Sequence, residues 1–249
     1  MSDIHAPVAD ITQEAYRILE HADAEKISLR LLGGLAIRLR CSSIENDVRF
    51  QRSYADLDFV TLTQWNGKTK ALFARLGYVG NKSFNSRHGY QRLLFYDELN
   101  ERKIDIFIDR MNMCHTLDFR NRLSIDKQTL PVSDLLMTKL QIVELTEKDI
   151  LDTIALFHDY AVEKDDLAIN ASYITRLVGQ DWGLYRTFEL NLNKISAFAT
   201  EHAFPAQVLE RIQTLISAME GCPKSAKWKM RAVVGERVRW YEQPEETHK

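Results

Sequence analysis

The chain has 249 residues, of which 45% are hydrophobic and 27% are charged, and its formal net charge is −2. These values exclude fibrous and disordered architectures, and they supply no overall positive charge that would attract nucleic acid or an anionic membrane. The three cysteines lie far apart and form no CxxC pair, so neither a disulfide framework nor a cysteine-based zinc site is indicated.

The sequence predicts a cytoplasmic protein with no membrane partner. Met1–Glu14 contain three acidic residues and no apolar run, so a secretory signal is not expected. No stretch approaches the roughly 20 apolar residues that a membrane-spanning helix needs. Cysteines without a pairing pattern also fit a reducing compartment.

The first elements form a strand, a glycine turn and a helix. Ile11–Ala24 has the apolar spacing of an amphipathic helix. Ile27–Leu32 is short and rich in apolar residues, which predicts a strand. Gly33-Gly34 interrupts it, and Leu35–Leu39 continues with helix-forming residues.

Three further strands and a helix are expected before residue 110. The period-2 placement of Asp56, Asp58 and Val60 opposite Leu57 and Phe59 predicts a strand over Asp56–Leu62, and Lys68–Leu76 has a helical pattern. Tyr90–Tyr96 and Lys103–Asp109 predict a hairpin, because the polar segment Asp97–Arg102 separates two runs rich in β-formers.

The patterns become helical from Ser133 onward. Pro131, Pro205, Pro223 and Pro244 lie between the segments, where helix-breaking residues belong. The predicted helices are Leu135–Leu145, Asp149–Phe157, Tyr173–Val178, Tyr185–Phe198, Gln207–Met219 and Lys227–Tyr241. We therefore predict an α/β (α+β) fold, with a domain built on a small mixed β-sheet at 1–130 and a helical domain at 131–249.

Two aspartates share one face of a predicted strand. Asp56 and Asp58 are two residues apart, so their side chains project in the same direction. Carboxylates held this close repel each other unless a cation lies between them or one is protonated. Magnesium supplies such a cation, because it prefers carboxylate oxygens together with the phosphate oxygens of a substrate.

A third aspartate lies in the middle of a strand made for burial. Asp105 alternates with Ile104 and Ile106, and an unpaired charge there would cost several kcal/mol. If this strand neighbours the one that carries Asp56 and Asp58, the three carboxylates form a cluster. Such a cluster is able to hold two metal ions for nucleotidyl or phosphoryl transfer.

The Gly33-Gly34 turn has a functional and a structural interpretation. Between a strand and a helix, glycines let backbone N–H groups and the helix N-terminus approach phosphates closely. A tight turn that needs positive φ would also select glycine. Neither the glycine pair nor the DxD spacing is informative alone, but their combination with Asp105 favours a functional site.

These motifs resemble a known superfamily. Leu31-Leu-Gly-Gly-Leu-Ala36, Asp56-Leu-Asp58 and Ile104-Asp-Ile106 are similar to the pattern of polymerase-beta-type nucleotidyltransferases, and in particular to the AbiEii/AbiGii toxin group. The resemblance covers residues 28–157. Asp134–Gln141 and Lys148–Asp152 resemble the helical segment that follows the catalytic sheet in that group.

The resemblance implies an enzyme that transfers a nucleoside monophosphate from an NTP to an RNA (such as tRNA), protein or small-molecule acceptor. It implies that Asp56, Asp58 and Asp105 bind two Mg²⁺ ions, with Asp105 also acting as general base. Gly33 and Gly34 would lie under the triphosphate, and Lys139 would neutralise phosphate charge. A solvated helix position is the alternative for Lys139. An antitoxin is a further expected partner.

Two departures from the pattern leave an alternative open. Gly34 stands where many members have a serine, and 21 residues separate Gly34 from Asp56, a long spacing that includes Arg49 and Arg52. The alternative is a catalytically degenerate fold that binds a nucleotide or a partner without chemistry.

Two other patterns are noted. His158-Asp159 matches the HD dipeptide of metal phosphohydrolases, but an ordinary helix end is favoured because no further ligands are evident. A basic C-terminal stretch with aromatic residues would suit RNA, although aromatics in a core with charges in water are favoured. Its members are Lys224, Lys227, Trp228, Lys229, Arg231, Arg237, Arg239, Trp240 and Tyr241.

Overall fold

The computed structural model describes residues 6–243, which form two compact units. The first comprises the described residues up to Ala36 together with Arg52–Met111 and Asp118–Pro131. The second comprises Ile37–Gln51, Asn112–Leu117 and the described residues from Val132 on. Residues 1–5, which are part of the stretch considered for a secretory signal, lie outside the described residues. Pro244, one of the predicted helix breakers, also lies outside them.

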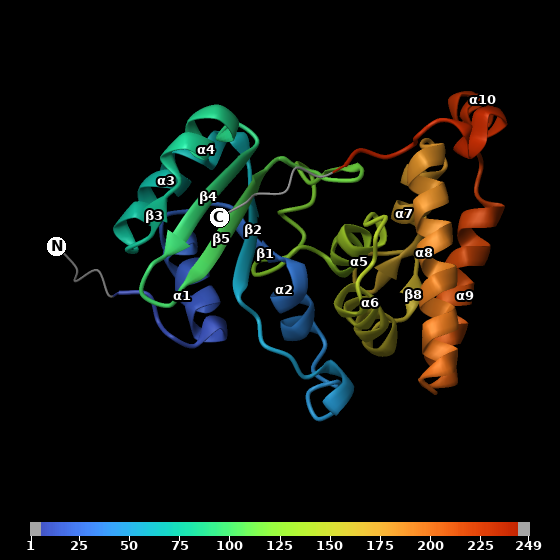
Figure 1. Ribbon diagram of the computed structural model, residues 1–249, viewed down its shortest axis with the longest axis horizontal. Coiled ribbons are helices and arrows are strands. Elements are labelled where there is room, and N and C mark those ends of the chain that lie inside the picture. Colours follow the sequence, from blue (N-terminus) through green and yellow to red (C-terminus); the bar gives the residue numbers. More distant parts are fainter. Residues whose placement is uncertain (1–5, 244–249) are drawn as a thin grey trace. The chain divides into compact units, whose positions relative to one another are not determined.

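A mixed sheet is the centre of the first unit (Figure 1). Its strand order is β1-β2-β5-β4-β3, with β2 parallel to β5 and the other pairs in this path antiparallel. The strands of this path are β1 (Leu29–Leu32), β2 (Asp56–Thr61), β3 (Val79–Gly80), β4 (Arg92–Asp97) and β5 (Arg102–Ile108). Off this path, β6 (Arg110–Asn112) pairs with β5 and β7 (Thr116–Asp118) pairs with β6, and residues 112 and 116–117 of these strands belong to the second unit. This mixed sheet confirms the predicted α+β class.

One face of the sheet is an apolar core. Helix α1 (Ile11–Ala24) buries Ile18, and α3 (Asn66–Arg75) buries Phe73. The Phe73 ring contacts Phe59 of β2 and Phe95 of β4, with centroids 6.0 and 5.1 Å away. Because side chains alternate along a strand, this packing leaves Asp58 and Asp105 on the opposite face.

Two further helices lie next to strands of the sheet along the chain. Helix α2 (Gly33–Arg40) begins directly after β1, and α4 (Lys82–His88) precedes β4. The sequence predicted α2 from Leu35, but not α4, whose start is capped by Asn81 through a hydrogen bond from the Phe84 N–H. The predicted hairpin is β4–β5, and Asp97 closes its turn by accepting the Leu99 and Asn100 N–H groups.

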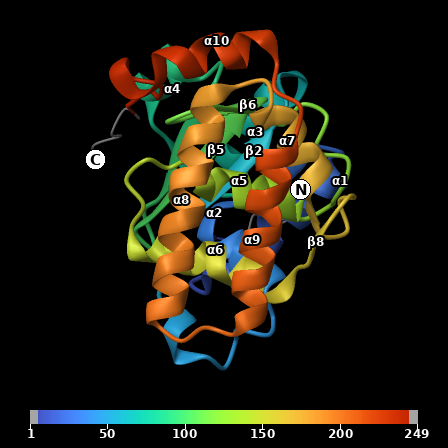
Figure 2. The ribbon, with the colours of Figure 1, turned by 90° about the vertical axis from the view of Figure 1, so that its right-hand side faces the viewer.

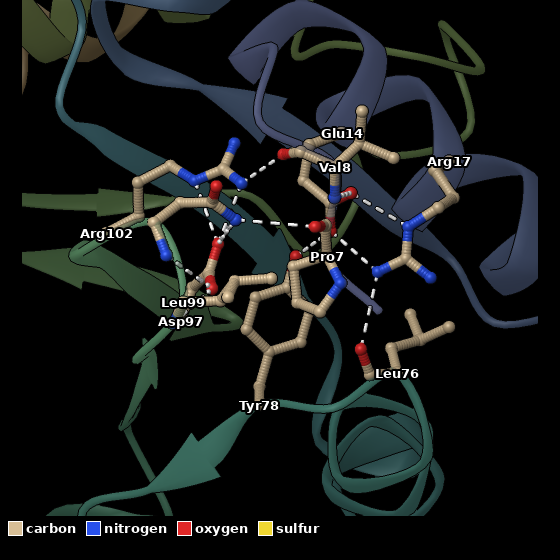
Figure 3. Close-up of polar contacts among 10 residues, drawn as sticks. Pro7, Val8, Glu14, Arg17, Leu76, Tyr78, Asp97, Leu99 and Arg102 are labelled. Carbon is tan, nitrogen blue, oxygen red and sulfur yellow. Dashed lines mark hydrogen bonds and ion pairs between the residues drawn. The ribbon is translucent and has the colours of Figure 1, made fainter. Parts of the chain in front are cut away.

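A buried ionic network joins α1 to the far end of the sheet (Figure 3). Glu14 is fully buried, and it accepts hydrogen bonds from the Arg17 guanidinium at 2.7 Å and from the Tyr78 hydroxyl. Nearby, Asp97 pairs with Arg102 at 2.7 Å, and the Arg102 guanidinium also donates to the Val8 carbonyl. Burial, followed by the bond to Glu14, raises the pKa of Tyr78 well above its ordinary value. The network fixes the segment that precedes α1.

The second unit is helical, as the sequence predicted. In it α8 and α9 run side by side, and α10 lies at the end from which α8 begins (Figure 2). The helices are α5 (Val132–Leu140), α6 (Glu147–Asp159), α7 (Ala171–Val178), α8 (Trp182–Glu201), α9 (Ala206–Gly221) and α10 (Ala226–Val234), with a small sheet of β8 (Val162–Glu163) and β9 (Ile169–Asn170). No helix among residues 6–243 is long and apolar enough to cross a membrane.

Two segments that the sequence assigned to the first domain belong to the second unit. Phe50 packs against Phe204 at a centroid distance of 5.8 Å, and the Tyr160 hydroxyl donates to the Arg40 carbonyl. The His115 N–H donates to the Gln141 side chain at 3.0 Å. These contacts link residues far apart in the chain, which is why a boundary drawn at one point of the sequence does not describe them. The predicted helix over 227–241 is also too long, because Gly235 ends α10 with a positive φ of 59°.

Candidate active site

Two of the predicted aspartates are neighbours across the central strand pair. In the parallel register of β2 and β5, Asp58 lies opposite Asp105 and Asp56 lies opposite Lys103. Register partners in adjacent strands project from the same face, so all three carboxylates start from one face of the sheet. Asp56 is exposed, Asp58 is half-buried and Asp105 is 4% exposed.

Gly33 lies directly against the Asp58 carboxylate. It has a φ of +78°, and a Cβ atom built on it would lie 2.3 Å from Asp58 Oδ2 and 3.2 Å from Asp58 Cγ. Two independent constraints therefore demand glycine here, one from the backbone conformation and one from space. Because Gly33 and Gly34 are the first two residues of α2, they bring the start of this helix to the carboxylate.

Asp105 is held by cations of its own sheet. The Arg92 guanidinium, on β4, donates from Nε to Asp105 Oδ1 at 2.7 Å and from its second nitrogen to Oδ2. Lys103 Nζ lies 3.6 Å from Oδ2. Arg92 also lies over the Phe107 ring, 5.0 Å from its centroid, which restricts the guanidinium. Both oxygens of Asp105 are thus engaged in a bidentate, partly buried ion pair.

The three carboxylates do not meet as a ready-made metal centre. Within residues 6–243 no group of three or more His, Cys, Asp or Glu side chains is arranged to hold a metal ion. Asp56 and Asp58 remain a two-carboxylate pair on one face, which suits a magnesium ion that keeps water or phosphate oxygens as its other ligands. Asp105 would join them only after Arg92 releases it.

Lys139 lies in the helical unit and has carboxylate partners there. It is on α5, and its Nζ lies 2.8 Å from Asp149 Oδ1 and 2.9 Å from Asp152 Oδ2, both on α6. Burial opposes its charge, but the charges of Asp152 and Asp149 outweigh burial and raise the pKa of Lys139. The alternative for Lys139, a solvated helix position, does not describe its place in this partly buried triad. Its contact with phosphate stays a prediction.

Residues 37–51, which make up most of the long segment between Gly34 and Asp56, belong to the helical unit. Arg49 pairs with Asp47 at 2.6 Å and lies over the Phe204 ring, 4.1 Å from its centroid. His158-Asp159 is the end of α6, as favoured, where His158 Nδ1 lies 2.9 Å from both Asp159 Oδ1 and Ser43 Oγ.

The comparisons with known proteins include a distant structural likeness. No family model matches the sequence, and the search of curated proteins found no match. Among solved structures, the antibiotic-resistance factor ANT(2'')-Ia is similar, with a TM-score of 0.43 and 16% identity, over 67% of this chain and 94% of that chain. A likeness this distant identifies neither the reaction nor the substrate of this chain.

Arg92 is the site residue that the sequence analysis missed. The hairpin was predicted, and its short turn between Asp97 and Arg102 sets the register in which Leu94 lies opposite Asp105. That register puts Arg92 one position diagonal to Asp105 on the same face, within reach of a long side chain. The sequence did carry one indication of such a partner, because a buried Asp105 needs a positive charge nearby.

Proposed function

We propose that the chain is a magnesium-dependent nucleotidyltransferase that transfers a nucleoside monophosphate from an NTP to an acceptor hydroxyl group. The observation that carries the proposal is the contact between the Asp58 carboxylate and Gly33 at the start of α2. Asp56 lies two residues before Asp58, and Asp105 lies opposite Asp58 in the neighbouring strand β5. A glycine turn, a helix start and carboxylates on one sheet face are the parts that a metal-bound triphosphate requires.

Asp56 and Asp58 would hold the metal. Bound magnesium would polarise the phosphate and neutralise charge that develops on it. The half-buried position of Asp58 against Gly33 fixes where its carboxylate can lie, while the exposed Asp56 is accessible to an incoming Mg·NTP complex. The expectation of two ions, with Asp105 as a shared ligand, is part of the proposal and requires Arg92 to move.

The acceptor hydroxyl would attack the α-phosphorus, and the bond from that phosphorus to the bridging oxygen of the β-phosphate would break. Pyrophosphate leaves with that oxygen and its electron pair, and the acceptor proton passes to Asp105 as general base. The N–H groups at Gly33 and Gly34 would face the triphosphate. In this scheme the Arg92 guanidinium would leave the Asp105 carboxylate and bind the phosphate instead. The positive charge of Arg92 would therefore stay paired throughout the reaction.

The acceptor and the partners belong to the same proposal. RNA such as tRNA, a protein or a small molecule each supplies the hydroxyl group that the reaction needs. Lys139 would contact phosphate only by exchanging Asp149 and Asp152 for it. Membership of the AbiEii/AbiGii group, an antitoxin partner and a cytoplasmic location stay predictions from the sequence.

The direct test is turnover. The protein is incubated with each labelled NTP, Mg²⁺ and a panel of tRNA, protein and small-molecule hydroxyl acceptors, and pyrophosphate release is measured. We expect release that depends on Mg²⁺ and that Asp58→Asn abolishes. Absence of transfer across the panel, together with NTP binding that Asp56→Asn/Asp58→Asn leaves unchanged, would refute the proposal.

One observation favours the second candidate, a degenerate fold that binds a nucleotide without chemistry. Arg92 occupies both oxygens of Asp105, the place where a metal or an acceptor proton would have to be received. This candidate predicts NTP binding without turnover. Pyrophosphate release that Asp105→Asn abolishes while the protein still binds Mg·NTP would eliminate it.

A further inference from the structure

Helix α10 meets the beginning of α8 in the helical unit (Figure 2). The residues of this junction line a pocket of about 170 Å³. It has no role in the proposed transfer reaction. Three of the four tryptophans of the chain line it, together with two basic side chains. Its lining residues are Gln180, Asp181, Trp182, Gly183, Lys227, Trp228, Arg231 and Trp240.

The aromatic walls are fixed by the surrounding structure. Trp182 is 8% exposed and makes an edge contact with Trp240, with centroids 6.0 Å apart. The Trp240 indole N–H donates to Thr187 Oγ1 at 3.0 Å. Trp228 packs edge-on against Tyr185 at 5.3 Å. Walls that need no rearrangement bind a flat ring at low entropic cost.

The basic side chains give the pocket a positive balance. Lys227 is exposed on the first turn of α10, and Arg231 lies one turn later on the same side. Arg231 lies 4.7 Å from the Trp182 ring centroid and donates to the Gly235 and Val238 carbonyls, which hold the guanidinium in place. Against these two cations stands the single carboxylate of Asp181, which caps α8 by accepting the Leu184 N–H.

One polar atom of the wall lacks a partner. The indole N–H of Trp228 is buried and finds no hydrogen-bond acceptor among the described residues. A buried donor left unpaired costs about 1–3 kcal/mol. Because this nitrogen is buried, the pocket presents the ring of Trp228 to a ligand and not its N–H.

We propose that this pocket binds one nucleotide, with the base against the tryptophan rings and the phosphate at Lys227 and Arg231. The volume is close to the roughly 150 Å³ of a cavity that holds one benzene ring, so a pyrimidine base fits. Stacking on aromatic rings is the sequence-tolerant way to hold a base. Lys227 and Arg231 carry one more charge than Asp181 neutralises, and a phosphate supplies the negative charge that pairs with it.

The test titrates the full chain in EDTA and in an Asp58→Asn background, so that magnesium-dependent binding at the proposed active site does not contribute. Tryptophan fluorescence and calorimetry follow uridine, ribose 5-phosphate, UMP and a short oligo(U). We expect UMP to quench saturably and to bind at least about 10-fold more tightly than either half of the molecule. Tighter binding of oligo(U) than UMP identifies single-stranded RNA as the source of the nucleotide, and equal binding identifies the free nucleotide.

Matched variants separate the pocket from general charge. Lys227→Gln removes a lining cation, while Lys229→Gln removes an exposed cation of the same helix that does not line the pocket. We expect Lys227→Gln to weaken UMP binding about 5- to 10-fold and Lys229→Gln to leave it within about 2-fold. Trp228→Ala removes one aromatic wall and should weaken UMP binding at least about 5-fold. Equal effects of the two lysine variants, or ribose 5-phosphate binding as tightly as UMP, would overturn the proposal.

Discussion

Replacement of Gly33 by alanine perturbs the contact on which the proposed site depends. The new Cβ would lie 2.3 Å from Asp58 Oδ2, which is 1.1 Å shorter than the 3.4 Å at which ordinary contact begins. A non-glycine residue at a φ of +78° costs roughly 1–2 kcal/mol, and turning Asp58 off its rotamer costs roughly 0.5–1.5 kcal/mol. We expect the free energy of unfolding to fall by about 2–3 kcal/mol.

Two other glycines provide controls for this variant. Gly235 has a φ of +59° and a ψ of −142°, with nothing within 4 Å of a built Cβ, so Gly235→Ala carries the cost of a glycine backbone conformation without a clash. Gly67, in α3, has neither constraint, so Gly67→Ala should leave stability unchanged or raise it by up to about 1 kcal/mol. Urea unfolding followed by circular dichroism gives the three free energies.

The same Gly33 variant also tests the site. A displaced Asp58 carboxylate should weaken Mg·NTP binding at least about 10-fold in calorimetry, which corresponds to about 1.4 kcal/mol. Gly235→Ala and Gly67→Ala should bind as the unaltered protein does. If the free energy of unfolding of Gly33→Ala lies within about 0.5 kcal/mol of that of the unaltered protein, and both bind Mg·NTP equally well, the argument from this contact is wrong.

Glu14→Ala leaves Arg17 and Tyr78 without their buried partner, and should lower the free energy of unfolding by about 3–5 kcal/mol in urea titration; a loss below about 1 kcal/mol would contradict this. Arg92→Ala leaves Asp105 buried beside Lys103 alone, and should cost about 3 kcal/mol, which Arg92→Ala/Asp105→Ala should partly restore; a double variant as unstable as Arg92→Ala would refute the pairing. Burial lowers the pKa of His115 below its ordinary 6.5, so the folded state favours the neutral ring, and its contribution to stability is present above pH 6.5 and lost as the pH falls below that value. Thermal melting from pH 7.5 to 5 should show this loss, and His115→Gln should flatten it; an unchanged slope in His115→Gln would assign the effect to another group.

Local patterns predicted the elements that position the site. Alternating burial located the strands that carry Asp58 and Asp105, and the Gly33 break located the start of α2, because these depend on residues close in sequence. Pairing of β2 with β5 was only conditional in the sequence, since it joins strands more than 40 residues apart. The fold settled that register in favour of the expected neighbours.

The side-chain partners were beyond the reach of the sequence patterns. Arg92 binds Asp105 and two carboxylates of α6 bind Lys139, and both pairings depend on tertiary packing. A carboxylate between isoleucines indicated that a counter-charge was needed, but not whether a metal or an arginine supplies it. The segments 37–51 and 112–117 joined the helical unit for a similar reason, since their contacts are with residues far along the chain.

Calorimetric titration with an α,β-methylene NTP analogue, which binds without turnover, tests the central claim most directly. The unaltered protein and Asp58→Asn are each titrated with the analogue in Mg²⁺ and in EDTA. We predict that binding to the unaltered protein requires Mg²⁺ and that Asp58→Asn in Mg²⁺ resembles the unaltered protein in EDTA. Binding of equal affinity in all four titrations would show that the Asp58 carboxylate beside Gly33 does not hold a metal-bound triphosphate.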